Sequence, residues 1–327
     1  MPAANTRWSW VWVTAADYVG MTAVLAGLLV FFGVFAENFF SLATFRTIAD
    51  QVPDITIIAV GMTFVLIIAG IDLSVGSVLA FAGAVLGAVV IQAKLPVAAG
   101  IAACLGVGLV CGVVNGLVVI RWRLPSFIVT LGMLEIARGA AFFVTDSQTI
   151  YMFDTLRFVT DTRVLGLSLP FVVALAVVAA GQVILSLTVF GRYMVAVGTN
   201  EQAVRLSGID PRPIKLAVFT LCGCACGLAS IIHTARYQAN PNNGAGLELQ
   251  AIAAVVIGGT SLMGGRGSVV STFFGVLIIK VLETGLAQVG AQEPTKRFIT
   301  GCVIVAAVIL DFYRQRLRKT QRLLSFE

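Results

Sequence analysis

Two stretches of the chain, Val97–Ile120 and Leu167–Phe190, each continue for 24 residues without one charged side chain. An α-helix of about 20 apolar residues matches the thickness of a bilayer core. Charged residues make up only 12% of the chain, whereas soluble domains usually contain about 25%. These charges are too few to cover a water-soluble globule of 327 residues, so we predict an integral membrane protein.

Apolar runs recur along the whole chain and predict an all-α, polytopic fold with about ten transmembrane helices. The second and eighth runs end in glycine-rich sequence, which predicts glycine-broken helices near the centre of the bundle. Residues 1–327 are expected to form one transmembrane domain, with its core at 18–313 and a basic tail at 314–327. The expected spans are Tyr18–Ala36, Val52–Ala69, Val75–Ala93, Pro96–Ile120, Pro125–Val144, Leu167–Phe190, Ile214–Ala235, Leu249–Met263, Val269–Val289 and Phe298–Phe312.

The distribution of Lys and Arg predicts how these spans are oriented. Ten spans place both termini on one side of the membrane. If that side is the cytoplasm, the cytoplasmic segments carry 13 Lys and Arg residues and the outer segments carry 7. The positive-inside rule therefore favours two cytoplasmic termini. The net charge of +6 is then explained by orientation, and no nucleic-acid partner is expected because no soluble segment carries a basic, aromatic face.

The cysteine-rich sequence "CGCAC" (Cys222–Cys226) does not predict a metal site. On a helix Cys222 and Cys224 point about 200° apart, so the three thiols cannot meet one ion. Small residues of this kind favour a close contact between two membrane helices. The single histidine, His233, has no second His or Asp at helical spacing, so it is a poor metal ligand.

The segment "LIIAGIDLSVGSVLAF" (Leu66–Phe81) places a carboxylate, Asp72, and two helix-breaking glycines, Gly70 and Gly76, in apolar sequence. Broken backbone at membrane depth survives only where protein buries it or where it lines a wet cavity. An unpaired carboxylate there costs about 3 kcal/mol. Asp72, Ser74 and free backbone groups could satisfy one another where a helix restarts at Val75. Two interpretations remain: a hinge or gate beside a transport path, and a short cytoplasmic turn in which Asp72 is only an N-cap.

A second segment repeats this pattern. "AGIDLSVGSV" (Ala69–Val78) aligns with "GGTSLMGGRGSV" (Gly258–Val269) through a small residue and Gly, then Leu, then Gly-Ser-Val. Glycine-interrupted spans at corresponding places in two halves of a membrane protein indicate a translocation pathway. The residues predicted to form the pathway or its gate are Gly70, Asp72, Ser74, Gly76, Gly258, Gly259, Thr260 and Ser261.

Charged residues inside the spans are expected to neutralise one another. Glu135 and Arg138 are three residues apart, as are Lys280 and Glu283. This is contact spacing on a helix. Internal ion pairs are therefore favoured over a proton relay, which needs further ionisable groups along its path.

The cytoplasmic segment at 191–213 contains a short, well-delimited helix. Thr199 and Gln202 fit a capping box. "EQAVRL" (Glu201–Leu206) can form up to two turns with a Glu201–Arg205 ion pair, and Gly208 supplies a stop. Such a helix is suited to a groove on a partner; the alternative is a solvated loop helix. The residues expected to form this docking loop are Gly191, Asn200, Glu201, Ala203, Val204, Arg205, Leu206 and Gly208.

Four motifs together resemble the permease subunits of ribose-type ABC sugar importers, in the larger group that also holds the branched-chain amino acid permeases. The likeness extends from about Val52 to Arg314. The motifs are "GIDLSVGS", "PSFIVTLGMLEIARG" (Pro125–Gly139), "GRYMVAVGTNEQAVRLSGI" (Gly191–Ile209) and "ELQAIAAVVIGGTSLMGGRGSV" (Glu248–Val269). The resemblance implies a bacterial inner-membrane transport subunit that is not itself an enzyme. It also implies that 191–208 is the loop that couples to an ATPase and that the two glycine-rich elements form the pathway core.

The partners also follow from the resemblance. It implies two cytoplasmic ATPase domains that bind ATP and Mg, and so no cofactor in this chain, which lacks a P-loop sequence. A periplasmic sugar-binding protein and a second permease copy, or a paralogue, complete the expected complex. Pentoses, hexoses and polyols all fit as cargo. The alternative is an ion-coupled secondary transporter of a small polar solute; Asp72 is its only unpaired candidate carboxylate, which weighs against it.

Overall fold

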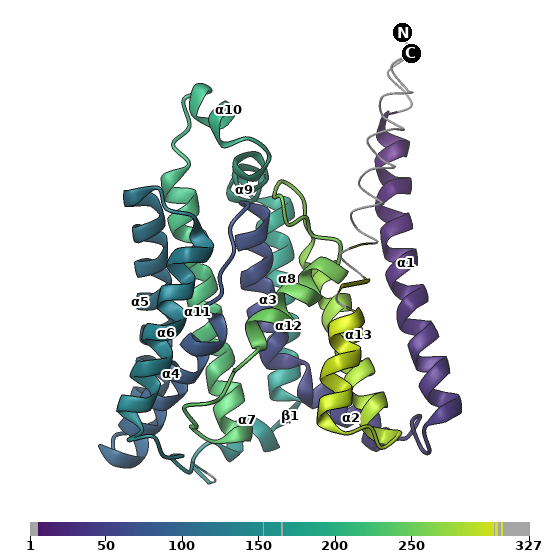
Figure 1. Cartoon of the computed structure of the whole chain (residues 1–327), viewed down its shortest axis with the longest axis vertical. Helices are drawn as coiled ribbons and strands as arrows, with labels where there is room; N and C mark the ends of the chain where they lie inside the picture. Colours follow the sequence, from purple (N-terminus) through teal and green to yellow (C-terminus); the bar gives the residue numbers. More distant parts are fainter. Residues whose placement is uncertain (1–5, 153, 165, 304, 307–308, 310–327) are drawn as a thin grey trace.

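The computed structural model describes residues 6–152, 154–164, 166–303, 305–306 and 309. Most helices run along the long axis of the molecule, and α10 projects from one end of it (Figure 1). In chain order the elements are α1 (Thr6–Phe35), α2 (Leu42–Gln51), α3 (Pro53–Ile67), α4 (Val75–Gly87), the π-helical turn η1 (Ala88–Gln92), α5 (Val97–Trp122), α6 (Ser126–Val144), α7 (Arg157–Asp161), β1 (Arg163–Val164), β2 (Leu167–Ser168), α8 (Leu169–Leu187), α9 (Val189–Thr199), α10 (Glu201–Leu206), α11 (Arg212–Tyr237), α12 (Leu247–Ile257) and α13 (Val269–Gln288). The two short strands form an antiparallel hairpin.

The helical membrane architecture is confirmed, but ten spans are not. Among the described residues six helices are long and apolar enough to cross a membrane, or seven if α2 and α3, bent by 42°, form one span. Those six, which are α4 with η1, α5, α6, α8, α11 and α13, match the third to seventh and ninth predicted spans. The first and eighth predictions correspond to shorter apolar helices, at Gly20–Phe35 and α12. The tenth falls partly outside the described residues, and the basic tail at 314–327 lies wholly outside them.

Helices α5 and α11 meet at a close contact built from small residues. An ideal Cβ on Gly108 would overlap the Gly223 carbonyl oxygen, and one on Gly112 would lie 3.1 Å from the Gly223 Cα. The Cys104 thiol donates to the Gly227 carbonyl oxygen at 3.3 Å. Glycines four residues apart let membrane helices approach backbone to backbone. The predicted role of Cys222–Cys226 in a small-residue helix contact is confirmed, since this stretch of α11 forms one side of it.

Candidate functional site

Each of the two glycine-rich elements begins with the same pair of backbone hydrogen bonds, which closes the end of the preceding helix. At the end of α3 the Ala69 N–H donates to the Leu66 carbonyl and the Gly70 N–H to the Val65 carbonyl, both at 2.9 Å. At the end of α12 the N–H groups of Gly259 and Thr260 make the same pair of bonds, at 2.8 and 3.1 Å. The left-handed residue is Ala69 (φ 59°) in the first element and Gly259 (φ 82°) in the second. Gly70 is therefore not the residue that ends the helix, and the sequence alignment was wrong by one position here.

Both elements end where a helix restarts after a serine. Helix α4 begins after Ser74, and α13 begins after Ser268, whose hydroxyl accepts from the Ser271 N–H at 3.3 Å. The backbone therefore pairs Ser74 with Ser268, whereas the shared Gly-Ser-Val letters had paired Ser77 with it. Gly76 was expected to break a helix but lies inside α4. Its missing side chain leaves room for the Gly244 carbonyl, which an ideal Cβ at this position would overlap.

Asp72 lies inside the bundle, with only 2% of its surface exposed. Its Oδ1 accepts from the Ser74 N–H at 2.9 Å and from the Ser74 hydroxyl at 2.6 Å. The Asn115 amide of α5 donates to the same hydroxyl at 3.0 Å. From α6, Ser126 and Thr130 accept the neighbouring backbone N–H groups of Ile71 and Leu73. The predicted capping around Asp72 is confirmed, and burial places it within protein rather than in an exposed turn.

We expect Asp72→Ala to lower the thermal stability and the uptake activity of the assembled transporter, while Asp72→Asn keeps most of both. Alanine removes the acceptor of two hydrogen bonds and leaves buried donors unsatisfied, at about 1–3 kcal/mol each, whereas the asparagine carbonyl can still accept them. Thermal unfolding in detergent and uptake into vesicles measure the two effects. Equal stability of the alanine and asparagine variants would contradict this role for the carboxylate.

The two elements touch each other and the end of α9. The Gly265 N–H donates to the Ile67 carbonyl at 2.8 Å. An ideal Cβ on Gly198 in α9 would overlap this carbonyl and would lie 2.7 Å from the Gly265 nitrogen. Behind this junction, the buried hydroxyls of Thr63 and Thr272 are 2.8 Å apart. Segments separated by up to 209 residues thus converge near the end of α3.

Within the second element Gly258 packs tightly, with an ideal Cβ 2.7 Å from the Ser271 carbonyl oxygen, while Thr260 and Ser261 are buried. Ser261 closes the turn, since its hydroxyl accepts from the Met263 N–H at 3.2 Å. Seven of the eight predicted pathway residues are thus buried in or beside the two broken elements, and Gly259 is exposed.

The residue that caps the N-terminus of α10 is not the predicted one. Asn200 is the N-cap, and its Oδ1 accepts from the Ala203 N–H at 3.0 Å. The Thr199 hydroxyl instead donates to the Val195 carbonyl at 2.7 Å, because α9 continues to Thr199 and holds it in helical conformation. Gly208 ends the segment as expected, with φ at 86°.

The Glu201 carboxylate anchors α10 to the rest of the chain. It accepts from Arg205 at 2.6 Å, the predicted pair, and from Lys215 of α11 at 2.5 Å. Partial burial by itself would raise the pKa of Glu201, but the hydrogen bonds and charges of Lys215 and Arg205 together hold that pKa below its usual value. The carboxylate therefore stays ionised at neutral pH and its two ion pairs persist.

The apolar residues of α10 do not form one face. Val204 is 7% exposed and packs inside the chain, whereas Leu206 is 90% exposed. Ala203 and Arg205 are exposed as well. Gly191, predicted to belong to the loop, lies in α9 against the carbonyls of α8, where an ideal Cβ would overlap the Leu185 carbonyl. The protruding part of the predicted docking loop is therefore α10 alone.

One of the two predicted intrahelical ion pairs is present. Lys280 and Glu283 are 2.8 Å apart. Arg138, in contrast, points away from its own helix and donates to the carbonyls of Pro241 and Asn243 at 2.5 and 2.7 Å. The expected Arg138–Glu135 pair is therefore wrong, because the chain before α12 offers Arg138 two backbone acceptors that the sequence could not reveal.

A buried pair between α3 and α11 was missed. The His233 Nδ1 lies 2.6 Å from the Asp54 Oδ2, and both side chains are buried. The Asp54 Oδ1 also accepts from the Ile55 N–H at 2.8 Å. An Asp directly after a proline indicates a helix start, and nothing local links it to a residue 179 positions later.

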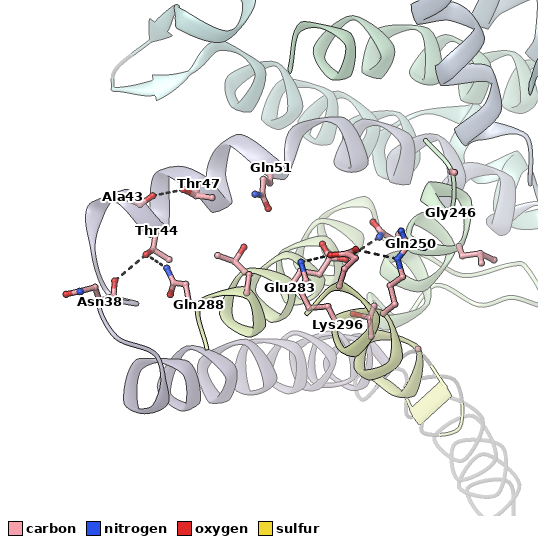
Figure 2. Close-up of a pocket in the computed structure, with 18 of the residues that line it drawn as sticks. Asn38, Ala43, Thr44, Thr47, Gln51, Gly246, Gln250, Glu283, Gln288 and Lys296 are labelled. Atoms are coloured by element: carbon pink, nitrogen blue, oxygen red, sulfur yellow. Dashed lines mark hydrogen bonds and ion pairs between the residues drawn. The ribbon is translucent and has the colours of Figure 1, made fainter. Parts of the chain in front are cut away.

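A polar cavity of about 760 Å³ lies away from α10, between α2, α12, α13 and residues 293–301. Figure 2 shows polar side chains of α2 facing those of α12 and α13 across it. Gln288 donates to the Thr44 hydroxyl at 2.6 Å, and Gln250 donates to Glu283 at 3.2 Å. None of the eight predicted pathway residues, all of which the structure describes, lines this cavity. The only sequence signal would have been the polar residues of α2, a helix that was not predicted.

Comparisons with known proteins agree over most of the chain. The protein family described as "Branched-chain amino acid transport system / permease component" matches residues 44–308. The ribose import permease protein RbsC of Escherichia coli (strain K12) is 39% identical over 295 residues, which cover 88% of this chain and 91% of that protein. The fructose import permease protein FrcC of Rhizobium meliloti is 33% identical over 90% of this chain and 84% of its own length. The L-arabinose transport system permease protein AraH of Escherichia coli (strain K12) is 32% identical over 98% and 96%. No solved structure matches the chain.

Proposed function

The chain belongs to the family of branched-chain amino acid transport system / permease components, and from that premise we propose that its cargo is a sugar or a polyol. It is a multi-pass permease subunit of an ABC importer in the inner membrane. Relatives that match it over most of its length are named for ribose, fructose and L-arabinose import. We assign the binding of ATP and Mg to a partner ATPase.

The observation that carries the coupling part of the proposal is α10. It projects beyond the ends of the membrane helices (Figure 1), is fixed to α11 through Glu201 and Lys215, and presents Leu206 to its surroundings. An exposed leucine on a rigidly anchored helix is suited to a groove on a partner protein. We assign this groove to the ATPase, which must transmit force to a permease whose sequence contains no P-loop.

Orientation follows from the same end of the molecule. The N-terminal end of α1 lies at the end that carries α10 (Figure 1), and the Lys and Arg residues favour cytoplasmic termini. The polar cavity then faces the periplasm, where a sugar-binding protein delivers the cargo. A second permease copy or a paralogue completes the membrane part of the proposed complex. Ion-coupled transport is not proposed, because Asp72 is buried and bonded to Ser74.

We expect Leu206→Asp to lower substrate-stimulated ATP hydrolysis by the assembled complex at least tenfold. A charge at the centre of an apolar contact must be desolvated without a partner, and central contacts dominate interface energies. Hydrolysis is measured in proteoliposomes containing the permease, the ATPase and the binding protein. Ligand binding by the separate binding protein should not change.

The matched probe is crosslinking from Ala203→Cys in a Cys302→Ser background, which removes an exposed native thiol. It should capture the ATPase chain. Val204→Asp is unsuitable as a docking test because Val204 packs within the chain and this variant should lose folded protein. Normal coupling by Leu206→Asp together with no crosslink from Ala203→Cys would leave α10 a solvated helix.

A further inference from the structure

The polar cavity is built like a small-molecule site. Its volume of about 760 Å³ falls within the range of about 300–1,000 Å³ typical of such sites. Nine of the lining residues carry a hydroxyl or amide group, and apolar atoms, including those of Ala245, Leu249 and Ala287, contribute the larger share of the surface. A solute with many hydroxyl groups and a few C–H faces would match both kinds of surface.

Three buried polar atoms in the lining have no partner among the described residues. They are Gln250 Oε1, Thr284 Oγ1 and Thr300 Oγ1. Thr284 and Thr300 are each only 8% exposed. A buried donor or acceptor left unsatisfied costs about 1–3 kcal/mol, so these groups favour a bound polar molecule. They come from α12, α13 and residues 293–303, which places them around one space rather than on one helix.

The charges around the cavity are balanced. Glu283 pairs with Lys280 at 2.8 Å, and Glu293 pairs with Lys296 at 2.6 Å and with Arg297 at 3.4 Å. The charged groups that line the cavity, Glu283, Glu293, Lys296 and Arg297, sum to zero and each has a partner. A zwitterionic amino acid would need an unpaired acid and an unpaired base. An uncharged solute needs neither.

We propose that the polar cavity is a binding site for a sugar or polyol, formed by Thr284, Thr300 and Gln250. Amino acids are not expected to bind there, because the charged side chains of the cavity pair with one another or with Lys280. The inference rests on the proposed function and locates cargo contact on the side of the permease away from α10. Binding there is weak and transient because most of the cavity lining already satisfies its own hydrogen bonds, which leaves few groups free for the solute.

The test is protection of a cysteine placed in the cavity. Ala287→Cys in the full-length Cys302→Ser permease is labelled with a maleimide in nanodiscs, with D-ribose, D-fructose, L-arabinose or L-leucine present. At least one sugar should slow labelling, and L-leucine should not. Ala203→Cys, at the opposite end of the molecule (Figure 1), should label at the same rate throughout.

Matched substitutions then assign the contacts. Thr284→Val and Thr300→Val should each raise the sugar concentration needed for protection by roughly 2- to 12-fold, the effect of one lost hydrogen bond. Thr56→Val is the control, because Thr56 is also buried with an unpartnered hydroxyl but lies outside the cavity. A shift equal to that of Thr56→Val, or no protection by any of the sugars, overturns the proposal.

The failure of this site and the failure of the proposed function have different signatures. If the assembled complex imports one of the sugars while Ala287→Cys is never protected and the Thr284→Val, Thr300→Val double variant imports normally, the cavity assignment is wrong and the function stands. If the complex imports L-leucine and none of the sugars, the proposed cargo is wrong. Ala287→Trp, which fills the cavity with a large side chain, should impair sugar import if the site is on the route.

Discussion

Gly198→Ala should abolish uptake by the assembled transporter and lower the stability of the permease by about 3 kcal/mol or more, the upper end of typical overpacking costs. The added methyl group would overlap the Ile67 carbonyl and come within 2.7 Å of the Gly265 nitrogen. Both are backbone atoms, so the strain cannot be relieved by rotating a side chain. The Ile67–Gly265 hydrogen bond joins the two broken elements, and the methyl group would separate them.

Uptake into proteoliposomes and thermal unfolding of the purified permease measure this effect. Gly139→Ala is the control, since no described residue lies within 4 Å of an ideal Cβ at Gly139; alanine there should be neutral or slightly stabilising. Normal uptake by Gly198→Ala would show that α9 and the end of α3 can separate without functional cost.

The second large effect is expected at the contact of α5 and α11. Gly223→Val should prevent accumulation of folded permease, because an ideal Cβ at Gly223 would overlap the Gly108 carbonyl and lie 2.8 Å from the Gly112 Cα. Two helices that touch through their backbones must move apart along their whole length to admit a branched side chain. The yield of monodisperse protein and its midpoint of thermal unfolding measure the outcome.

Gly106→Val provides the matched control on α5. No described residue lies within 4 Å of an ideal Cβ there, and Gly106 is exposed on the outer surface of the bundle. Valine at this position should insert and fold like the parent chain, because its helix propensity is no lower than that of the glycine it replaces. Equal yields of the Gly106 and Gly223 variants would contradict the contact of α5 and α11.

The long apolar helices could be predicted from the sequence because their signal is local. Charge-free runs such as Val97–Ile120 and Leu167–Phe190 have the length of a bilayer, and α5 and α8 lie within a few residues of these limits. Helices α2 and α9 were missed, since their polar residues and glycines read as connections between spans. α10 was predicted with correct limits, because its charged pair and the glycine after it lie within eight residues.

The candidate site was harder to predict, for two reasons. Equivalent positions of the repeat are defined by backbone hydrogen bonds at Ala69 and Gly259, whereas the alignment followed identical letters and shifted the register. The polar cavity and the Asp54–His233 pair join segments that are far apart in the chain, and each partner alone resembles an ordinary helix residue. Arg138 shows the same limit. Glu135 is near it in sequence and was the predicted partner, but Arg138 donates instead to the carbonyls of Pro241 and Asn243, more than 100 residues away.

The left-handed residues at the ends of α3 and α12 give the two elements the same shape but different stiffness. Gly259 occupies positive φ at almost no steric cost and can visit both sides of the Ramachandran map. Ala69 holds the same conformation at a cost of about 1–2 kcal/mol, and its side chain restricts it to a narrower range of φ and ψ. The backbone at the second element can therefore change conformation at little energetic cost, whereas unwinding the end of α3 would break its two closing hydrogen bonds and relieve the strain at Ala69.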